Sequence, residues 1–249
     1  MADPILQTRL PKDMTQARAL PGIQPEQGPW LRVDEAYGGQ MARRIALLDG
    51  VPEQVLYRED ASDPAAQELL AEALGAMPSL GFFVEGTHVT CPDGRRVDVS
   101  STPPLEALGR CLQSDFVIME RRGDQHVLTG AVLCFPASWS LAEKAGRPLV
   151  DIHIPVTEYT TNMARRVQRL FDGVQVGRPL WRFNQLWYQD AELHQPRSAT
   201  EPRRVGAHLP TGPYYRSERQ TLLRLPLSGA VIFVIHTYVL ARADVPDLT

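Results

Sequence analysis

A histidine stands in a short apolar run in the middle of the 249-residue chain. His153 lies within residues 150–156, where β-branched neighbours predict a ring that is buried or lines the wall of a site. A buried neutral imidazole needs a hydrogen-bond partner or a metal. Two interpretations stay open: a hydrogen-bonded core histidine, and an axial ligand of haem iron, since imidazole nitrogen commonly fills that position.

A run of charged residues follows further along, at residues 215–224. If it is a strand, Arg216 and Glu218 face one side and Arg219 the other. One side must face the core, so at least one charge is partly buried and needs a partner. The run predicts either an ion-pair ladder or an anion site, because the arginine fork suits a carboxylate such as a haem propionate.

Two further positions carry polar groups inside apolar strand patterns. His236 shares a strand face with Val234 and Tyr238, which favours a core histidine or, alternatively, a ligand. Arg182 and Asn184 share a face of another run and are candidates for contact with a substrate or a propionate.

The composition excludes several classes of protein. Hydrophobic residues make up 43% of the chain and the net charge is −3, which favours a globular protein and excludes nucleic acid as a partner. The three cysteines are too widely spaced for a zinc site or a disulfide framework. The amino terminus lacks the apolar core of a signal peptide, and no run is long enough to span a membrane. We therefore expect a cytoplasmic protein.

Periodicity predicts the elements that position these residues. Helices are expected at residues 33–48 (with Asp34 as cap), 63–77, 104–113, 138–145 and 161–171. Two strands are expected within residues 81–100, a hairpin at 115–120 and 126–135, a strand at 181–188, and two long strands at 216–226 and 229–240.

The pattern predicts an α+β fold with a mostly antiparallel sheet flanked by helices. Strands and helices do not alternate regularly, which disfavours a doubly wound parallel sheet. Residues 1–29 carry five prolines and predict an extended arm; residues 30–249 predict a single domain. No nucleotide-binding, hydrolase or metalloprotease motif occurs.

Two long phrases resemble the alpha subunits of haem-dependent oxidative N-demethylases. They are LCFPASWSLAEKAGRPLVDIHIPV at residues 133–156 and RSERQTLLRLPLSGAVIFVIHTYV at residues 216–239, with shorter matches at residues 30–37 and 112–120. The resemblance implies a PAS-like haem-binding fold and oxidative removal of a methyl group from a small secondary amine such as dimethylamine, with formaldehyde released. The family often shows Arg-x-Asn-Trp where this chain has residues 182–185 as RFNQ, which implies a different substrate if that segment lines the site.

The resemblance also implies a cofactor and partners. The cofactor is haem b, with O2 as co-substrate and electrons from NAD(P)H through separate flavin and iron–sulfur subunits, so a hetero-oligomer is expected. His153 is the expected axial ligand and metal-binding residue, with His236 as the second candidate. Arg216 and Arg219 are expected to contact the propionates.

Supporting residues and rival functions complete the prediction. Asp151 or Glu218 would orient the histidine, and three tryptophans could hold a cationic amine through their rings: Trp139, Trp181 and Trp187. One alternative is a haem or small-ligand binding or sensor module without catalysis. Another is a haem-free structural or interaction protein that keeps the fold.

Overall fold

The computed structural model describes residues 3–16, 22–153, 161–202 and 211–246, with side chains for all of these except residues 153 and 161–165. The helices are α1 (Tyr37–Gly50), α2 (Pro52–Val55), α3 (Asp63–Ala76), α4 (Pro104–Cys111), α5 (Leu149–His153) and α6 (Thr161–Gly173), with 3-10 turns η1 (Lys12–Met14), η2 (Asp60–Ser62), η3 (Met77–Leu80) and η4 (Arg242–Asp244).

Ten described strands form two sheets. They are β1 (Gln24–Pro25), β2 (Leu56–Arg58), β3 (Phe83–Glu85), β4 (His88–Thr90), β5 (Arg96–Asp98), β6 (Asp115–Arg122), β7 (Gln125–Val132), β8 (Leu180–Tyr188), β9 (Tyr214–Arg224) and β10 (Val231–Ala241). The main sheet has the order β1-β8-β9-β10-β6-β7-β2, with antiparallel neighbours, and β3-β4-β5 forms a small second sheet. The predicted α+β class with a mostly antiparallel sheet is confirmed.

The long hairpin β9–β10 is the centre of the main sheet. It pairs eleven residues on each strand without a bulge, as alternating apolar and polar residues favour. Its turn contains Gly229 at φ +71°, a conformation that glycine adopts without strain. Glu68 of α3 accepts hydrogen bonds from the backbone N–H groups of Leu227 and Ser228, at 2.5 and 2.7 Å, and so fixes this turn to the helical layer.

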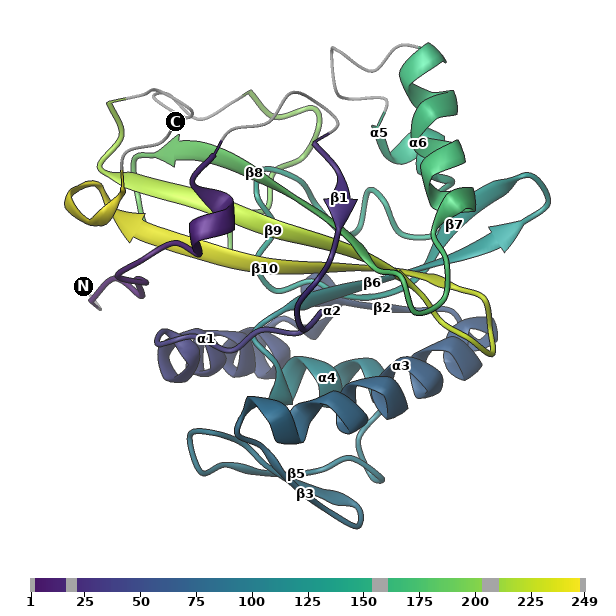
Figure 1. Cartoon of the computed structure of the whole chain (residues 1–249), viewed down its shortest axis with the longest axis horizontal. Coiled ribbons are helices and arrows are strands. Elements are labelled where there is room, and N and C mark those ends of the chain that lie inside the picture. Colours follow the sequence, from purple (N-terminus) through teal and green to yellow (C-terminus); the bar gives the residue numbers. More distant parts are fainter. Residues whose placement is uncertain (1–2, 17–21, 154–160, 203–210, 247–249) are drawn as a thin grey trace.

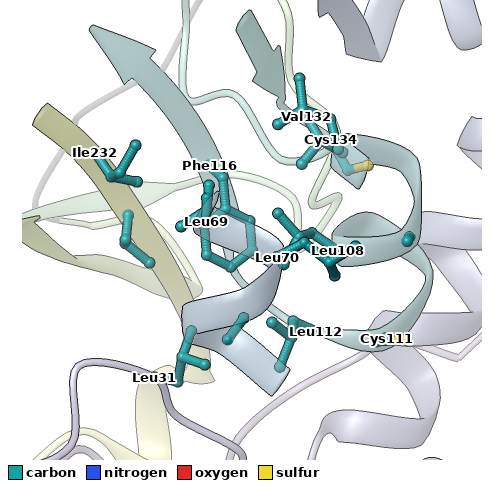
Figure 2. Close-up of a cluster of buried hydrophobic side chains, with 14 of the residues drawn as sticks. Leu31, Leu69, Leu70, Leu108, Cys111, Leu112, Phe116, Val132, Cys134 and Ile232 are labelled. Carbon is teal, nitrogen blue, oxygen red and sulfur yellow. The ribbon is translucent and has the colours of Figure 1, made fainter. Parts of the chain in front are cut away.

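Helices cover the main sheet on both faces (Figure 1). Helices α1, α3 and α4 pack on one face, with the small sheet beyond them, and α5 and α6 lie on the other face near β7. Figure 2 shows the core on the first face, where Phe116, Val132 and Ile232 of the sheet meet leucines of α3 and α4. Because side chains alternate along β6, Val117 lies on the opposite face, where it packs in a second core with Leu149 and Ile152 of α5.

The amino-terminal segment is built into the sheet. Beyond the end of β6, the backbone of β10 pairs with this segment: Gln7 N–H donates to Val239 O and Val239 N–H donates to Gln7 Oε1, both at 2.8 Å. Leu10 and Met14 are buried against aromatic residues of β8, β9 and β10. Strand β1 extends the sheet beside β8. The described residues of this segment therefore form part of the buried structure.

Three predicted elements differ from the structure. The prediction of a helix at residues 138–145 is wrong. Ala137 forms a β-bridge with Gln195 and Ser138 has φ +63°, so the chain enters this segment in an extended conformation and then makes only turns. Residues 81–100 form three short strands where two are expected. Helix α1 begins at Tyr37, later than expected, and Asp34 precedes it in a turn in which its carboxylate accepts the Ala36 N–H at 2.9 Å and its carbonyl oxygen accepts the Tyr37 N–H at 3.1 Å.

Candidate cofactor site

The face of the main sheet that packs against α5 and α6, here called the α6 face, carries a polar cluster. In the register of β8, β9 and β10, Arg182 lies opposite Gln220, which lies opposite Ile235. One step along, Asn184 lies opposite Glu218. Alternation therefore brings together polar side chains from β8 and β9 beside the apolar residues of β10.

Glu218 is the centre of this cluster and is 4% exposed. Its Oε2 accepts hydrogen bonds from Asn184 Nδ2 at 2.8 Å and Gln220 Nε2 at 3.2 Å, while Oε1 lies 3.5 Å from Arg216 Nη2. Asn184 Oδ1 accepts from the Glu218 N–H at 3.0 Å. Both carboxylate oxygens thus have partners within the cluster, which leaves Glu218 poorly placed to orient a histidine elsewhere.

Arg216 closes one end of the cluster. It is 3% exposed and donates to the carbonyl oxygens of Leu193 at 2.9 Å and Phe135 at 2.7 Å. It thereby ties β9 to residues 133–136, which open the first of the two long sequence phrases. Its Nη1 and Nη2 groups are engaged by protein, and only Nε lacks a partner among the described residues.

A buried ion pair also fixes residues 133–136. Arg44 Nη1 lies 2.6 Å from Asp115 Oδ1, with side chains 0% and 1% exposed. Asp115 also accepts the N–H groups of Cys134 at 2.7 Å and Phe135 at 3.0 Å. An ion pair that is excluded from water keeps its geometry, because breaking any of its hydrogen bonds would leave a buried charge without a partner, at a large cost in free energy. Sequence reasoning assigned no role to either residue, although the aspartate at the start of an apolar strand is a visible signal.

Arg182 differs from the other arginines of the sheet. It makes no hydrogen bond to any other described residue, and its Nε is shielded from water. Burial lowers the pKa of Arg182, and the charge of Glu218 only partly opposes this effect. The guanidinium stays charged at any physiological pH. The α6 face therefore presents one cation that has no hydrogen-bond partner among the described residues.

The apolar part of the α6 face adjoins this cluster. Val117 and Ile235 are buried, Phe233 and Trp139 pack against the same cluster of side chains, and α5 contributes Ile152. These side chains pack with Phe171 of α6, so the apolar part of the face is a core shared by the sheet and the two helices.

Lys144 lies in the first long phrase and was assigned no role from the sequence. Its Nζ lies 4.5 Å from the centroid of the Trp139 ring. Burial lowers the pKa of Lys144 to about 8, and the carboxylate of Glu143 only partly offsets this. An ammonium group in this environment is a cation–π partner of the tryptophan and is more easily deprotonated than usual.

Helix α6 is fastened to the sheet at two points. Arg224 of β9 donates to the carbonyl oxygens of Phe171 at 2.8 Å and Val174 at 2.7 Å, at the carboxyl end of the helix, where a cation is favourable. His126 of β7 is 1% exposed, and its Nδ1 lies 2.9 Å from Gln168 Nε2. These contacts fix the wall opposite the sheet.

His153 is the last residue of α5, two residues after the exposed Asp151. Its side chain lies outside the described residues, so its role as axial ligand stays a prediction. Ile152, its neighbour, packs in the apolar cluster of the α6 face. The structure therefore places the backbone of His153 at the border of this face.

His236 and Arg219 lie on the opposite face of the sheet. His236 Nε2 lies 3.0 Å from Asp34 Oδ2 and its Nδ1 lies 3.3 Å from Ser114 Oγ, so both ring nitrogens have protein partners. Iron ligation by His236 would require the loss of one of these contacts. Asp34, expected as a helix cap, accepts the Ala36 N–H just before α1 with Oδ1 and contacts this ring with Oδ2.

Arg219 is paired with the amino-terminal segment. It donates to Glu26 Oε2 at 2.6 Å and to Asp13 Oδ2 at 2.8 Å, and its Cζ lies 3.4 Å from the centroid of the Trp181 ring. Arg216 and Arg219 are thus on opposite faces of the sheet, and one haem cannot contact both. Of the four predicted cofactor residues, only Arg216 and the backbone of His153 are placed at the α6 face.

The three tryptophans expected to hold a cationic amine each face a protein cation. Lys144 lies over Trp139, and Arg219 lies over Trp181. Arg242 Cζ lies 3.9 Å from the centroid of Trp187. One face of each ring is therefore already occupied.

The donor set of the described residues suits a haem better than a free metal ion. Within the described ranges, no three histidine, cysteine or acidic side chains converge in a way that could hold a metal ion. A haem iron takes four ligands from its porphyrin and needs only an axial ligand from the protein. Apolar side chains beside Arg182, which has no hydrogen-bond partner among the described residues, are the groups that a flat, apolar cofactor with carboxylates would need.

The fold and site define an α+β protein with a candidate cofactor face on an antiparallel sheet. Residues 22–248 match the family model described as haem-dependent oxidative N-demethylase, alpha subunit-like. The chain belongs to this family, whose description names an oxidoreductase activity that depends on haem and implies an assembly of several subunits. Among the described helices, none has the length and apolar character needed to cross a membrane.

Proposed function

We propose that this chain is the haem-binding oxygenase component of a multi-subunit enzyme that removes a methyl group from a small secondary amine of the dimethylamine type. The observation that carries the proposal is the family match over residues 22–248, which includes both long phrases and the whole described α6 face. The antiparallel sheet with helices on both faces is compatible with a PAS-like haem-binding fold.

The α6 face is the proposed position of haem b. His153 is the proposed axial ligand, since it ends α5 at the border of this face while both nitrogens of His236 are engaged elsewhere. The apolar residues around Val117 and Ile235 would contact the porphyrin and exclude water. Arg216 acts indirectly in this proposal, because it holds residues 133–136 in place.

The reaction needs O2 and two electrons. Haem, when bound, supplies the chemistry of O2 activation. The balanced reaction is (CH3)2NH + O2 + 2e− + 2H+ → CH3NH2 + CH2O + H2O, in which the amine loses one methyl group as formaldehyde. The electrons would come from NAD(P)H through flavin and iron–sulfur groups on separate chains, in a cytoplasmic hetero-oligomer.

The test is formaldehyde release by the haem-loaded protein. With NADPH and a surrogate ferredoxin and ferredoxin reductase pair, we expect dimethylamine-dependent formaldehyde in proportion to the NADPH consumed. His153→Ala should abolish this activity and shift the Soret band, and His88→Ala, in the small sheet, is the matched control. A protein that binds haem but releases no formaldehyde from any methylated amine would instead favour a haem-binding or sensor module.

A further inference from the structure

The polar cluster of the α6 face contains more positive than negative charge. Arg182 and Arg216 contribute two cations, and Glu218 contributes the one carboxylate that contacts or faces them among the described residues. The neighbouring carboxylate of Asp115 is already paired with Arg44 at 2.6 Å. The cluster therefore carries an excess of one positive charge within the described part of the chain.

The excess charge is localised on Arg182. Glu218 Oε2 is bound by Asn184 and Gln220, and Glu218 Oε1 faces Arg216. Arg182 is left without a hydrogen bond to a described residue, although the adjacent rows of the sheet are densely paired. The Nε–H of Arg182 is shielded from water and has no acceptor among the described residues, which is unfavourable, and the planar fork of the half-buried side chain keeps its other donors available.

We propose that Arg182 binds a carboxylate of the ligand that occupies the α6 face. The planar fork matches a carboxylate in bidentate geometry, whereas a small cationic amine would be repelled there. The carboxylate could come from a haem propionate or from a substrate that carries one, such as an N-methyl amino acid. The first source rests on the proposed function, and the second changes the substrate class within it.

The first experiment compares haemin with haemin dimethyl ester, in which both propionates are blocked. Binding is measured by Soret titration of the apoprotein for the wild type, Arg182→Gln and Arg182→Lys, with the exposed Arg178→Gln as matched control. If Arg182 holds a propionate, Arg182→Gln weakens haemin binding by about 10- to 100-fold and leaves the ester unchanged. Arg182→Lys should retain part of the preference, because the charge remains and the fork is lost.

The second experiment identifies a substrate carboxylate. If Arg182→Gln binds haemin as the wild type does, the haem-loaded proteins are titrated with N-methylglycine and with dimethylamine. A Soret response to N-methylglycine that Arg182→Gln weakens by at least about tenfold, with an unchanged response to dimethylamine, places the carboxylate on the substrate.

Failure of the proposed function and failure of this inference have different signatures. If the wild type binds neither porphyrin, the proposed function fails, and the inference is decided by titrating the apoprotein with sodium propionate. A saturable shift of the Arg182 Nε–H resonance, assigned by its loss in Arg182→Lys, supports the anion site. The inference is overturned if Arg182→Gln has the same affinity as the wild type for haemin, the ester and N-methylglycine. It is also overturned if the Nε–H resonance does not respond to propionate.

Discussion

Asp34 connects the amino-terminal segment, the residues between α4 and β6, and β10, and its replacement tests the buried network around His236. Asp34 accepts hydrogen bonds from Gln7 Nε2 at 3.0 Å and Gln113 Nε2 at 2.9 Å, and lies 3.0 Å from His236 Nε2. Burial by itself raises the pKa of Asp34, but His236, Gln113 and Gln7 outweigh it and lower the pKa from 3.8 to about 2.

This pKa defines a contribution to stability. Since one pKa unit corresponds to about 1.36 kcal/mol, the difference between 3.8 and about 2 corresponds to about 2.4 kcal/mol in favour of the folded state. Because the folded pKa is the lower one, this contribution is complete above the unfolded pKa of 3.8 and is lost as the pH falls towards about 2. Asp34→Asn should therefore lower the free energy of unfolding by about 2 kcal/mol at neutral pH.

The assay is urea unfolding followed by tryptophan fluorescence at a series of pH values. The difference in free energy of unfolding between the wild type and Asp34→Asn should decrease as the pH falls from about 4 towards about 2. Asp60→Asn is the matched control, because its side chain is 97% exposed and the change should be close to neutral. The reasoning is refuted if Asp34→Asn loses less than about 0.5 kcal/mol of stability at neutral pH, or if its difference from the wild type does not change between about pH 4 and about pH 2.

Three further predictions concern burial and packing. Arg44→Met leaves Asp115 buried without its cation and should cost about 3–5 kcal/mol in urea unfolding; a loss below about 1 kcal/mol would contradict a tight pair. Gly109→Ala should cost about 1–3 kcal/mol, since its Cβ would lie 2.7 Å from Val132 Cγ2, and Val132→Ala should partly restore stability. Competitive acetylation of Lys144 should show a midpoint near pH 8; a midpoint above about 10 would show an ordinary, solvated amine.

Local sequence patterns were sufficient for much of the fold. The alternation in residues 216–240 predicts the long hairpin, and it also predicts that Arg216 and Arg219 face opposite sides. The proline-initiated helices α3 and α4 form as expected, because proline at the first turn removes an N–H that would have no partner anyway. These features depend on neighbours within a few residues.

The predictions that were incomplete or wrong share one cause, which is contacts between residues far apart in the sequence. Asp34 accepts a backbone N–H near the start of α1, as the sequence suggested, yet its further partners Gln113 and His236 come from distant segments. Arg219 looked like a propionate contact, yet Glu26, almost two hundred residues earlier, neutralises it. Arg182 was named only together with Asn184, and its lack of a hydrogen-bond partner among the described residues depends on how Glu218 distributes its oxygens. No local pattern encodes such competition between partners.

The chain's relation to haem is the central claim, and the visible spectrum of the purified protein tests it most directly. The protein should be purified from haem-supplemented cells and assayed as its pyridine haemochrome. We predict a Soret band and stoichiometric haem b, with the band shifted or lost in His153→Ala and retained in His236→Gln. A colourless protein that takes up no haemin would contradict the account and leave a member of the family that keeps the fold without the cofactor.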